Sequence, residues 1–221
     1  MILAYQVTYN TFDVGIYAGT KNIAIKTLDK REASAQCIVA TDQLLNAAQL
    51  TLKDITYLVV NRGPAPFTSL RVAISTVNGL AAATGIPIIG VNGLHAYVHE
   101  WQPTPGCATI IMLNAFNNDV YYAMAIQEQP VQFGCMASAL FAAQLPQLLG
   151  NQRAQCIGNG IELVKAHAPA LFATEQLTIV SPLAAASLTS VVALAQDAIM
   201  RGAGEKEVMP LYLKEIAYQT R

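Results

Sequence analysis

The amino-acid sequence predicts an α/β fold built from two similar halves, each with a mixed β-sheet and helices. Two observations lead to this prediction. Short β-prone runs alternate with runs of helical periodicity, and one order of elements (a strand meander, a helix, a strand and a helix) occurs twice. The second series begins after Pro103-Thr104-Pro105-Gly106, a stretch typical of a linker. We therefore expect an N-terminal subdomain over 1–102 and a C-terminal subdomain over 103–221, whose last helix or tail can return to the N-terminal half.

The first half opens with three β-prone runs separated by the turn-prone pairs Asn10-Thr11 and Gly19-Thr20, which favours a three-stranded meander. Apolar residues at helical spacing then predict a first helix, and Gly85-Ile86-Pro87 ends a second one. The residues expected along one side of the first helix are Ile38, Leu44, Leu45 and Ala48. The strands expected in this half span 2–7, 14–18, 22–27, 55–60 and 88–91, and the helices span 34–49 and 67–84.

In the second half, a turn at Asn117-Asn118-Asp119 separates two expected strands, and Gly202 and Gly204 end the last helix. The strands expected here span 107–113, 120–127, 154–157 and 177–180, and the helices span 138–149 and 183–201. The actin-like, sugar-kinase-like and Hsp70-like ATPases are built from two β-β-β-α-β-α halves of this kind. The element order therefore predicts a duplicated actin-like/Hsp70-like ATPase (ASKHA) fold, although fold class alone does not give function.

The composition is unusually poor in charge. The 221 residues are 53% apolar and 12% charged, whereas charged residues make up about 25% of ordinary soluble domains. The high content of core-forming residues excludes a disordered chain, and a net charge of −1 without a basic stripe argues against a nucleic-acid-binding surface. A surface with so few charges predicts that a protein partner covers part of it.

No Asp, Glu, Lys or Arg occurs from Val72 to His99. This run is interrupted by turn-forming residues, which favours a helix, a strand and a helix over one membrane span. The interruptions are Asn78-Gly79, Gly85-Ile86-Pro87 and Asn92-Gly93. The N-terminal residues show neither the basic region nor the cleavage site of a signal peptide. The four cysteines are scattered and form no Cys-x-x-Cys pair, which is typical of a reducing compartment. We therefore expect a cytoplasmic protein without membrane contact.

The stretch GPAPFTSLR, residues 63–71, is the most specific local pattern. Gly63 and Pro64 predict a tight exit from a strand, and Thr68 is a candidate N-cap for the following helix. One side of that helix is bulky and another is nearly smooth, so a second helix could approach it closely. The bulky stripe contains Phe67, Leu70, Ile74, Val77 and Ala81, and the smooth stripe contains Ser75, Gly79 and Ala82.

GPAPFTSLR resembles the GPGSFTGLR signature of the TsaB (YeaZ) family of bacterial tRNA threonylcarbamoyladenosine biosynthesis proteins. The resemblance extends over nearly the whole chain, in order and at fitting spacings. Four further segments carry it: Val72 to Val91 resembles the family's helix and strand, Asn114 to Ala123 its Asp-Ala-Arg-x-x-Glu-Val-Tyr, Gly158-Asn159-Gly160 its Gly-Asp-Gly, and Pro210 to Lys214 its Pro-x-Tyr-Leu-Arg.

The chain also departs from the family pattern. Members usually begin with a strand that ends in Asp-Thr-Ser, where this chain has Tyr5-Gln6-Val7-Thr8. Gln6 cannot supply the negative charge that helps to organise Mg²⁺ and phosphate in active actin-like ATPases. Asn114 and Phe116 replace the Asp and the Arg of Asp-Ala-Arg, while Ala65 and Ser69 replace two glycines. These departures mark a divergent member and weaken the case for a nucleotide site.

The resemblance implies a non-catalytic scaffold and activating subunit that pairs with the catalytic protein TsaD. With the ATPase TsaE, that pair transfers a threonylcarbamoyl group to the adenosine next to the anticodon of ANN-decoding tRNAs. ATP and metal then belong to TsaE and TsaD, this chain holds no cofactor, and tRNA is met only through the complex. TsaD-like proteins bind metal through a His-x-x-x-His pair on the helix before the Gly-Pro loop, and residues 34–49 contain no histidine.

The resemblance also places the partner interface on the two helices of the first half, where a homodimer and the TsaD heterodimer compete. The expected interface residues are Ile38, Thr41, Leu45, Thr68, Leu70, Arg71, Ser75, Asn78, Gly79 and Ala82. The remaining family-motif residues are Gly63, Pro64, Phe67, Tyr121, Gly158, Gly160, Pro210 and Tyr212. No catalytic and no metal-binding residue is expected.

Several alternatives stay open. The chain could be an active ATPase or kinase of the same fold, or a self-associating paralogue outside the tRNA pathway. His95 and His99 have the i, i+4 spacing of a zinc pair, but no third ligand is evident nearby and a solvated helix face is the favoured interpretation. Gly158-Asn159-Gly160 is either the remnant of an adenosine loop or a plain strand-to-helix turn. Arg71 lies unfavourably in the first turn of its helix, so it pairs either with a partner carboxylate or within this chain.

Overall fold

The computed structural model describes residues 1–181 and 185–214. The chain divides into two compact units. Unit 1 contains Met1–Ala96 and Ala185–Leu211, and unit 2 contains Tyr97–Ala184 and Tyr212–Arg221. Unit 1 is thus discontinuous in sequence, because a helix and a segment from the end of the chain complete it.

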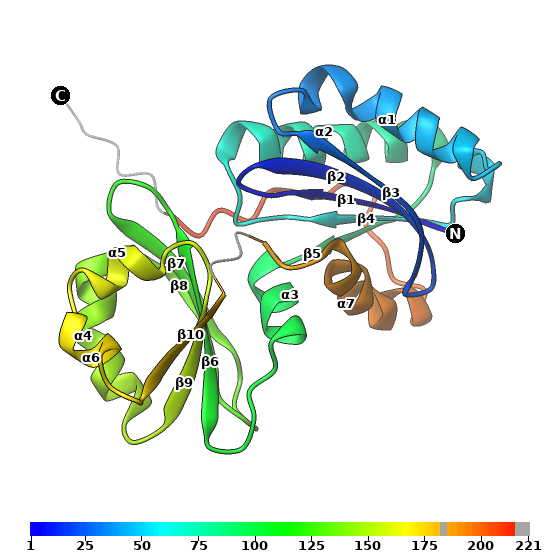
Figure 1. The fold of residues 1–221 in the computed structure, drawn as a ribbon. Coiled ribbons are helices and arrows are strands. Elements are labelled where there is room, and N and C mark those ends of the chain that lie inside the picture. Colours follow the sequence, from blue (N-terminus) through cyan, green and yellow to red (C-terminus); the bar gives the residue numbers. More distant parts are fainter. Residues whose placement is uncertain (182–184, 215–221) are drawn as a thin grey trace. The chain divides into compact units, whose positions relative to one another are not determined.

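Unit 1 is built on a mixed sheet. Among its described residues, five strands follow the order β3-β2-β1-β4-β5. The meander strands pair antiparallel, and β1, β4 and β5 pair parallel. Helices α1 and α2 cover one face of this sheet and α7 covers the other (Figure 1). The strands are β1 (Ile2–Val7), β2 (Thr11–Ala18), β3 (Lys21–Asp29), β4 (Tyr57–Asn61) and β5 (Ile88–Val91), and the helices are α1 (Ala33–Ala47), the short 3-10 helix η1 (Leu52–Asp54), α2 (Phe67–Thr84) and α7 (Leu188–Met200).

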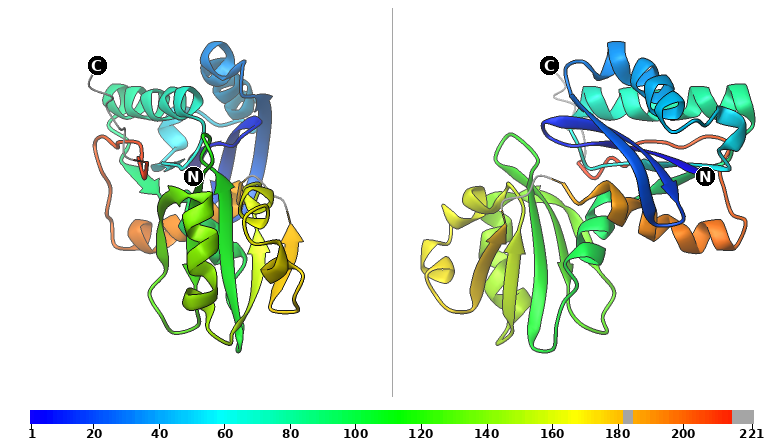
Figure 2. Two further views of the ribbon diagram at one scale, coloured as in Figure 1. Left: turned by 90° about the vertical axis from the view of Figure 1, so that its left-hand side faces the viewer. Right: turned by 45° about the vertical axis from the view of Figure 1, so that its right-hand side comes forward.

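Unit 2 repeats this topology. Its described strands follow the order β10-β9-β6-β7-β8, with β6 between an antiparallel meander and two parallel strands, as β1 is in unit 1. The helices of this unit lie on one face of its sheet (Figure 2). The strands are β6 (Cys107–Asn114), β7 (Asp119–Ala125), β8 (Gln132–Ala137), β9 (Arg153–Ile157) and β10 (Leu177–Ser181), and the helices are α4 (Ser138–Leu149), α5 (Ile161–Lys165) and α6 (Pro169–Phe172). Helix α3 (Gly93–Glu100) spans the change from unit 1 to unit 2.

The duplicated fold predicted from the element order is therefore confirmed, and several elements differ in detail. The sequence analysis did not assign residues to the third strand of the second meander, which is β8. None of the residues Gln132–Ala137 is fully buried, so the strand lacks a clear alternation of buried and exposed positions. Helix α7 begins at Leu188 and not at residue 183, since Ser187 caps it by accepting a hydrogen bond from the amide of Ser190 at 3.2 Å. Residues 183 and 184 lie outside the described residues.

The start of α2 also corrects the sequence prediction. Pro66 occupies the N-cap position and no side chain caps the helix, so Thr68 lies within the first turn. The buried side consists of Leu70, Ala73, Ile74, Val77 and Ala81. Phe67 was expected on that side but is 48% exposed, because the helix begins at this residue and its ring lies beyond the sheet-facing stripe. On α1, Ile38 is 52% exposed, while Cys37 beside it is buried.

No helix in the described ranges combines the length and the apolar run that a bilayer span requires.

Residues 204–211 pair with the edge strand β5 of the unit 1 sheet, and we call this segment the strap. Glu205 forms a two-way backbone bridge with Ile88 at the edge strand β5. The Asn78 amide on α2 accepts from the Val208 N–H and donates to the Val208 carbonyl, both at 3.0 Å, while the Val208 side chain is buried in the core. Arg62 donates from Nε to the Met209 carbonyl at 2.6 Å. The strap therefore belongs to the core of unit 1.

We predict that Asn78→Ala lowers the free energy of unfolding by about 1–3 kcal/mol, because it leaves two partly buried backbone groups without partners. Urea unfolding at equilibrium measures the change. Ser75→Ala on an exposed position of the same helix is the matched control and should change stability by less than about 0.5 kcal/mol. Equal effects of the two substitutions would show that the Asn78–Val208 hydrogen bonds do not stabilise unit 1.

Candidate functional site

A groove runs between α1 and α2 on the outer side of unit 1. Its larger part has a volume of about 510 Å³, and an adjoining part of about 420 Å³ continues toward the end of α1. Exposed apolar side chains line it, including Ile38 and Phe67. The larger part is lined by Ser34, Cys37, Ile38, Phe67, Thr68, Arg71, Val72, Ser75 and Thr76. Solvent-exposed apolar surface of this kind is typical of protein–protein contact.

The structure separates the predicted interface residues into two sets. Ile38, Thr68, Arg71, Ser75, Gly79 and Ala82 are exposed on α1 and α2. Thr41, Leu45 and Leu70 are buried within unit 1, and Asn78 is bonded to the strap. The hydroxyls of Thr41 and Tyr5 share a 2.9 Å hydrogen bond in the core. Thr41 and Leu45 nevertheless contribute to the floor of the smaller groove part.

Gly79 lies on open surface. A Cβ atom placed there meets nothing within 4 Å. Glycine costs about 1 kcal/mol in a helix interior compared with alanine, and no packing contact within the described chain requires that cost. The smooth stripe predicted from Ser75, Gly79 and Ala82 is thus accessible along α2.

Arg71 has an intrachain contact at the rim of the groove. Its guanidinium carbon lies 3.7 Å from the centroid of the Phe67 ring, one turn earlier on α2. This cation–π contact offsets part of the unfavourable position of a cation near a helix N-terminus. It also orients the planar guanidinium at the rim, where it can accept a carboxylate from a partner.

The carboxyl end of β1 is filled by a chain of buried amides, where an active actin-like ATPase needs an acidic residue. Gln6, 2% exposed, donates from Nε2 to the Ala186 carbonyl at 2.8 Å and accepts from Asn61 Nδ2 at 3.1 Å. Asn61 in turn accepts from the Gly63 N–H at 2.9 Å. Gly93 permits this arrangement, since a Cβ there would lie 2.6 Å from Asn61 Oδ1. We call this chain the amide plug.

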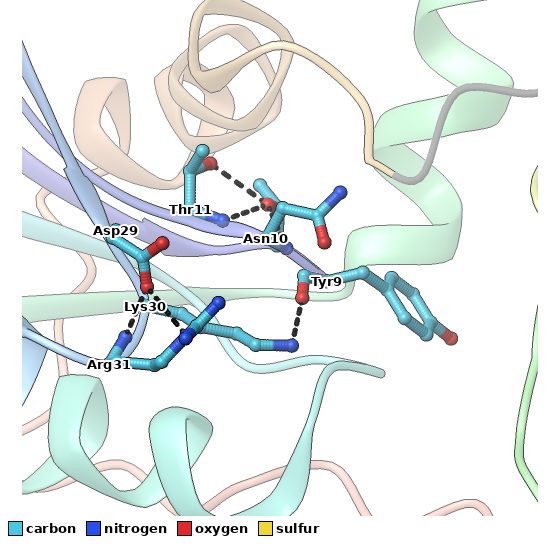
Figure 3. Close-up of polar contacts among 7 residues, drawn as sticks. Tyr9, Asn10, Thr11, Asp29, Lys30 and Arg31 are labelled. Atoms are coloured by element: carbon cyan, nitrogen blue, oxygen red, sulfur yellow. Dashed lines mark hydrogen bonds and ion pairs between the residues drawn. The ribbon is translucent and has the colours of Figure 1, made fainter.

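The β1–β2 hairpin beside the amide plug is bonded to itself (Figure 3). Thr8 Oγ1 accepts from the amides of Asn10 at 3.1 Å and Thr11 at 2.8 Å, and the Thr8 N–H donates to the Thr11 carbonyl. The Lys30 ammonium donates to the Tyr9 carbonyl from the end of β3. Amides that could cradle a phosphate are therefore used within the chain. In the described residues, no group of three His, Cys, Asp or Glu side chains could hold a metal ion.

Asp13 is the residue near this strand end that sequence reasoning missed. It lies opposite Gln6 in the β1–β2 register and accepts a 2.8 Å hydrogen bond from Thr27 on β3. Burial raises the pKa of this carboxyl, and hydrogen bonds led by that from Thr27 act in the opposite direction. Its position in the predicted strand could have pointed to it. Every second residue of a strand faces the same side of the sheet, so the side that Asp13 faces follows from the sequence.

We predict that Asp13→Asn stabilises the protein at pH 7. Because the folded-state pKa lies above that of the unfolded chain, the native state of the wild type loses stability as pH rises through the interval between the two values. Asparagine keeps an acceptor for Thr27 and carries no charge. Urea unfolding between pH 3 and 7 should therefore show a gain for the variant above this interval that vanishes below it. A loss of stability at pH 7 would mean that the carboxylate charge itself is used.

In unit 2, Gly158 and Gly160 are required by close packing against β6. A Cβ at Gly158, where φ is +119°, would lie 2.1 Å from the Met112 carbonyl oxygen, and one at Gly160 would lie 2.8 Å from Leu113. Asn159 accepts a 3.0 Å hydrogen bond from the Asn114 N–H. The stretch lies between β9 and α5, so it is a strand-to-helix turn that also fixes the end of β6.

The other family-motif residues lie in both units. Gly63, with φ +106°, and Pro64 are buried in the exit from β4. Tyr121 is partly buried in β7, and burial raises the pKa of its hydroxyl. Pro210 lies in the strap and Tyr212 follows it, 48% exposed.

The fold defines the class of protein. Two units of the same mixed topology, each a meander continued by parallel strands, are the architecture of the actin-like ATPase fold. A solved structure titled YeaZ from Pseudomonas aeruginosa has a TM-score of 0.70 at 19% identity and covers 96% of this chain and 99% of that one. Another, a protein from the same organism with similarity to peptidase YEAZ, has a TM-score of 0.74 at 20% identity, with the same coverage.

Sequence comparison finds similarity to proteins of one tRNA-modification pathway. The model of the family "TsaD: tRNA N6-adenosine threonylcarbamoyltransferase" matches residues 27–134. The tRNA threonylcarbamoyladenosine biosynthesis protein TsaB of Escherichia coli is 28% identical over 55% of this chain and 53% of its own length. TsaB of Buchnera aphidicola from Schizaphis graminum is 25% identical over 55% of this chain and 59% of its own length. The matches thus span little more than half of these curated relatives. The chain is therefore similar to proteins of the TsaB (YeaZ) family and diverges from them in sequence.

Proposed function

We propose that this chain is a non-catalytic scaffold and activating subunit that pairs with a TsaD protein in tRNA threonylcarbamoyladenosine biosynthesis. The observation that carries the proposal is the groove between α1 and α2. It combines exposed apolar side chains with the accessible smooth stripe around Gly79, which suits close approach by a second helix pair. The names of the TsaB relatives and the TsaD family match support the pathway.

The amide plug supports the non-catalytic part of the proposal. An Mg²⁺–nucleotide site needs an acidic oxygen and free amides at the end of β1. Gln6 is neutral and both ends of its amide are engaged, while the hairpin amides of Asn10 and Thr11 are bonded to Thr8. In this proposal ATP and metal belong to TsaE and TsaD, tRNA is met through the complex, and the assembly works in the cytoplasm.

Homodimer and heterodimer use the same face in this proposal. The groove of one copy can receive the α1–α2 pair of another copy, so addition of TsaD should convert a homodimer into a heterodimer. The mass in solution, measured by light scattering with and without the cognate TsaD protein, tests this. Absence of a complex at micromolar concentration, with both proteins folded, would overturn the proposal. Self-association alone would favour a paralogue outside the pathway, and turnover of Mg-ATP by the isolated chain would favour an active ATPase.

We predict that Gly79→Arg weakens binding of TsaD and self-association at least tenfold, because a long charged side chain then occupies the smooth stripe. The monomer should stay folded and gain up to about 1 kcal/mol, since Gly79 lies in a helix with open space around it. Calorimetric titration measures the binding, and urea unfolding measures the stability. Ala143→Arg, at an exposed position of α4, is the matched control and should leave both associations unchanged. Equal binding by wild type and Gly79→Arg would place the interface elsewhere.

A further inference from the structure

Strand β3 (Lys21–Asp29) is an edge strand of the unit 1 sheet (Figure 1). Its inner edge pairs antiparallel with β2 from one end to the other. Within residues 1–181 and 185–214, no strand pairs with its outer edge. A strand of nine residues in this position presents a row of backbone N–H and C=O groups to which another strand can bind.

The hydrogen-bond pattern identifies the backbone groups of β3 that face outward. The Lys30 N–H donates to the Asn10 carbonyl, so the sequence position just after β3 faces the hairpin at the end of β2. Because the direction alternates along an antiparallel strand, the N–H and C=O groups of Thr27 and Ile25 face away from β2. A β-bulge interrupts this alternation at Ile23, which has no partner in the register with β2. Thr27 and Ile25 therefore offer donors and acceptors at the outer edge.

The side chains beside these groups are apolar and exposed. Ile23 is 42% exposed and Ile25 is 48% exposed. Ala24 and Leu28 pack against the core on the α1 side, so Ile25 faces the opposite side of the sheet. On that side α7 covers β1, β2, β4 and β5, and Ile25 lies opposite Gly15 of β2, which has no side chain to cover it. Two isoleucines are thus open to solvent along the same edge.

Two lysines near this edge are bonded within unit 1. The Lys26 ammonium donates to Gln43 on α1, and the Lys30 ammonium donates to the Tyr9 carbonyl (Figure 3). Lysine side chains over an edge strand normally oppose pairing with another chain. Because these two are held by α1 and by the β1–β2 hairpin, they leave the outer edge near Ile25 accessible.

We propose that β3 pairs with β3 of a second copy of this chain, antiparallel and around a two-fold axis at Ile25. The two Ile25 side chains then lie opposite each other, and Ile23 of each copy lies opposite Thr27 of the other. Cross-strand pairs of β-branched side chains stabilise a sheet. The pairing joins the two unit 1 sheets into one continuous sheet and removes the open edge of both copies.

The charges at the ends of β3 favour a second copy as the occupant. The strand begins at Lys21 and ends at Asp29, so an antiparallel pair brings the lysine of each copy to the aspartate of the other. The contacts of Asp29 with Arg31 use Oδ1, which leaves Oδ2 to accept from that lysine. A two-fold axis one residue later would place both Lys26 side chains opposite each other, which repulsion disfavours. An interface between identical patches requires such self-complementarity.

This interface is separate from the groove and does not depend on the identity of the partner that binds there. The groove is lined by α1 and α2 residues, whereas the pairing uses the outer edge of β3. We expect the pairing to be weaker than association through the groove, because it uses one strand edge alone. Two copies whose grooves are filled by TsaD could still pair through β3, which would give an assembly of two heterodimers.

The first test is analytical ultracentrifugation of the full chain carrying Gly79→Arg, so that the remaining self-association reports on β3. Adding Ile25→Lys should raise the Kd of the dimer about tenfold, because like charges then meet at the axis. Lys21→Glu should raise it about threefold, and Lys21→Glu combined with Asp29→Lys should restore it. Ile179→Lys, at an exposed isoleucine of the edge strand β10 in unit 2, is the matched control and should change the Kd less than twofold. Thermal unfolding verifies that each variant is folded.

The second test is cross-linking in the presence of the thiol oxidant diamide, which determines the register. Ile25→Cys should form a disulfide between two copies, because the Cα atoms of directly opposite residues lie about 5.5 Å apart. Thr27→Cys is the matched control. In the proposed register its two copies lie four residues apart along the strands, about 13 Å, so they should not cross-link.

Each result supports or overturns the inference. A Gly79→Arg chain that stays monomeric at every measurable concentration would overturn the β3 pairing and spare the proposed function. Dimerisation that Ile25→Lys leaves unchanged would also overturn it. Cross-linking of Thr27→Cys at the rate of Ile25→Cys would show that the axis does not lie at Ile25. A wild-type chain that pairs through β3 but does not bind TsaD would overturn the proposed function alone.

Discussion

The amide plug is the interaction on which the rest of unit 1 depends. Gln6 joins the end of β1 to the backbone just before α7, and Asn61 joins it to the exit of β4. These groups are almost fully buried, so each hydrogen bond avoids the large cost of an unpaired polar atom in the interior. The plug thereby connects both faces of the sheet and fixes the direction in which the chain leaves toward α2.

The strand ends of unit 1 and its outer helices differ in whether their groups are left available for a ligand or partner. At the strand ends, where related folds receive a nucleotide, amides and hydroxyls are bonded to one another. On the outer side, α1 and α2 leave apolar side chains and a glycine exposed. In unit 1, the polar groups at these strand ends are thus satisfied internally, while α1 and α2 leave part of their apolar side chains exposed. That distribution suits a protein that acts by binding another protein, and it gives a physical basis for a chain with half the usual charge.

Local pattern was sufficient for much of the fold. Residues 67–84 and 88–91 match α2 and β5 at both ends, because Gly85 ends the helix in the left-handed conformation and Pro87 prevents its continuation. The duplication followed from element order, which does not depend on the fine position of any boundary. Strand β8 was missed since its exposed residues show no period of two.

Distant contacts fix several residues whose surroundings could not be predicted from the sequence. Asn78 was expected at the partner interface, but it bonds to Val208, 130 residues further along the chain. Asp13 gained its role only when the strands came together. Phe67 was assigned to the bulky, sheet-packing stripe of α2 because helical spacing gives a face and not its width. Local spacing carries no information on such tertiary neighbours.

The strap has a consequence for the order in which the protein is made. The core of unit 1 contains Val208, and α7 also packs on its sheet, so strands β1 to β5 are completed by residues that are translated after strand β10 of unit 2. The helices and strands of unit 2 described up to residue 181 are translated in between. During synthesis the unit 1 sheet therefore waits with an open edge and an uncovered face, which is the state most open to chaperones and to wrong pairing. A stall or cleavage before residue 205 would leave the older half of the molecule unfinished, although most of its sequence is present.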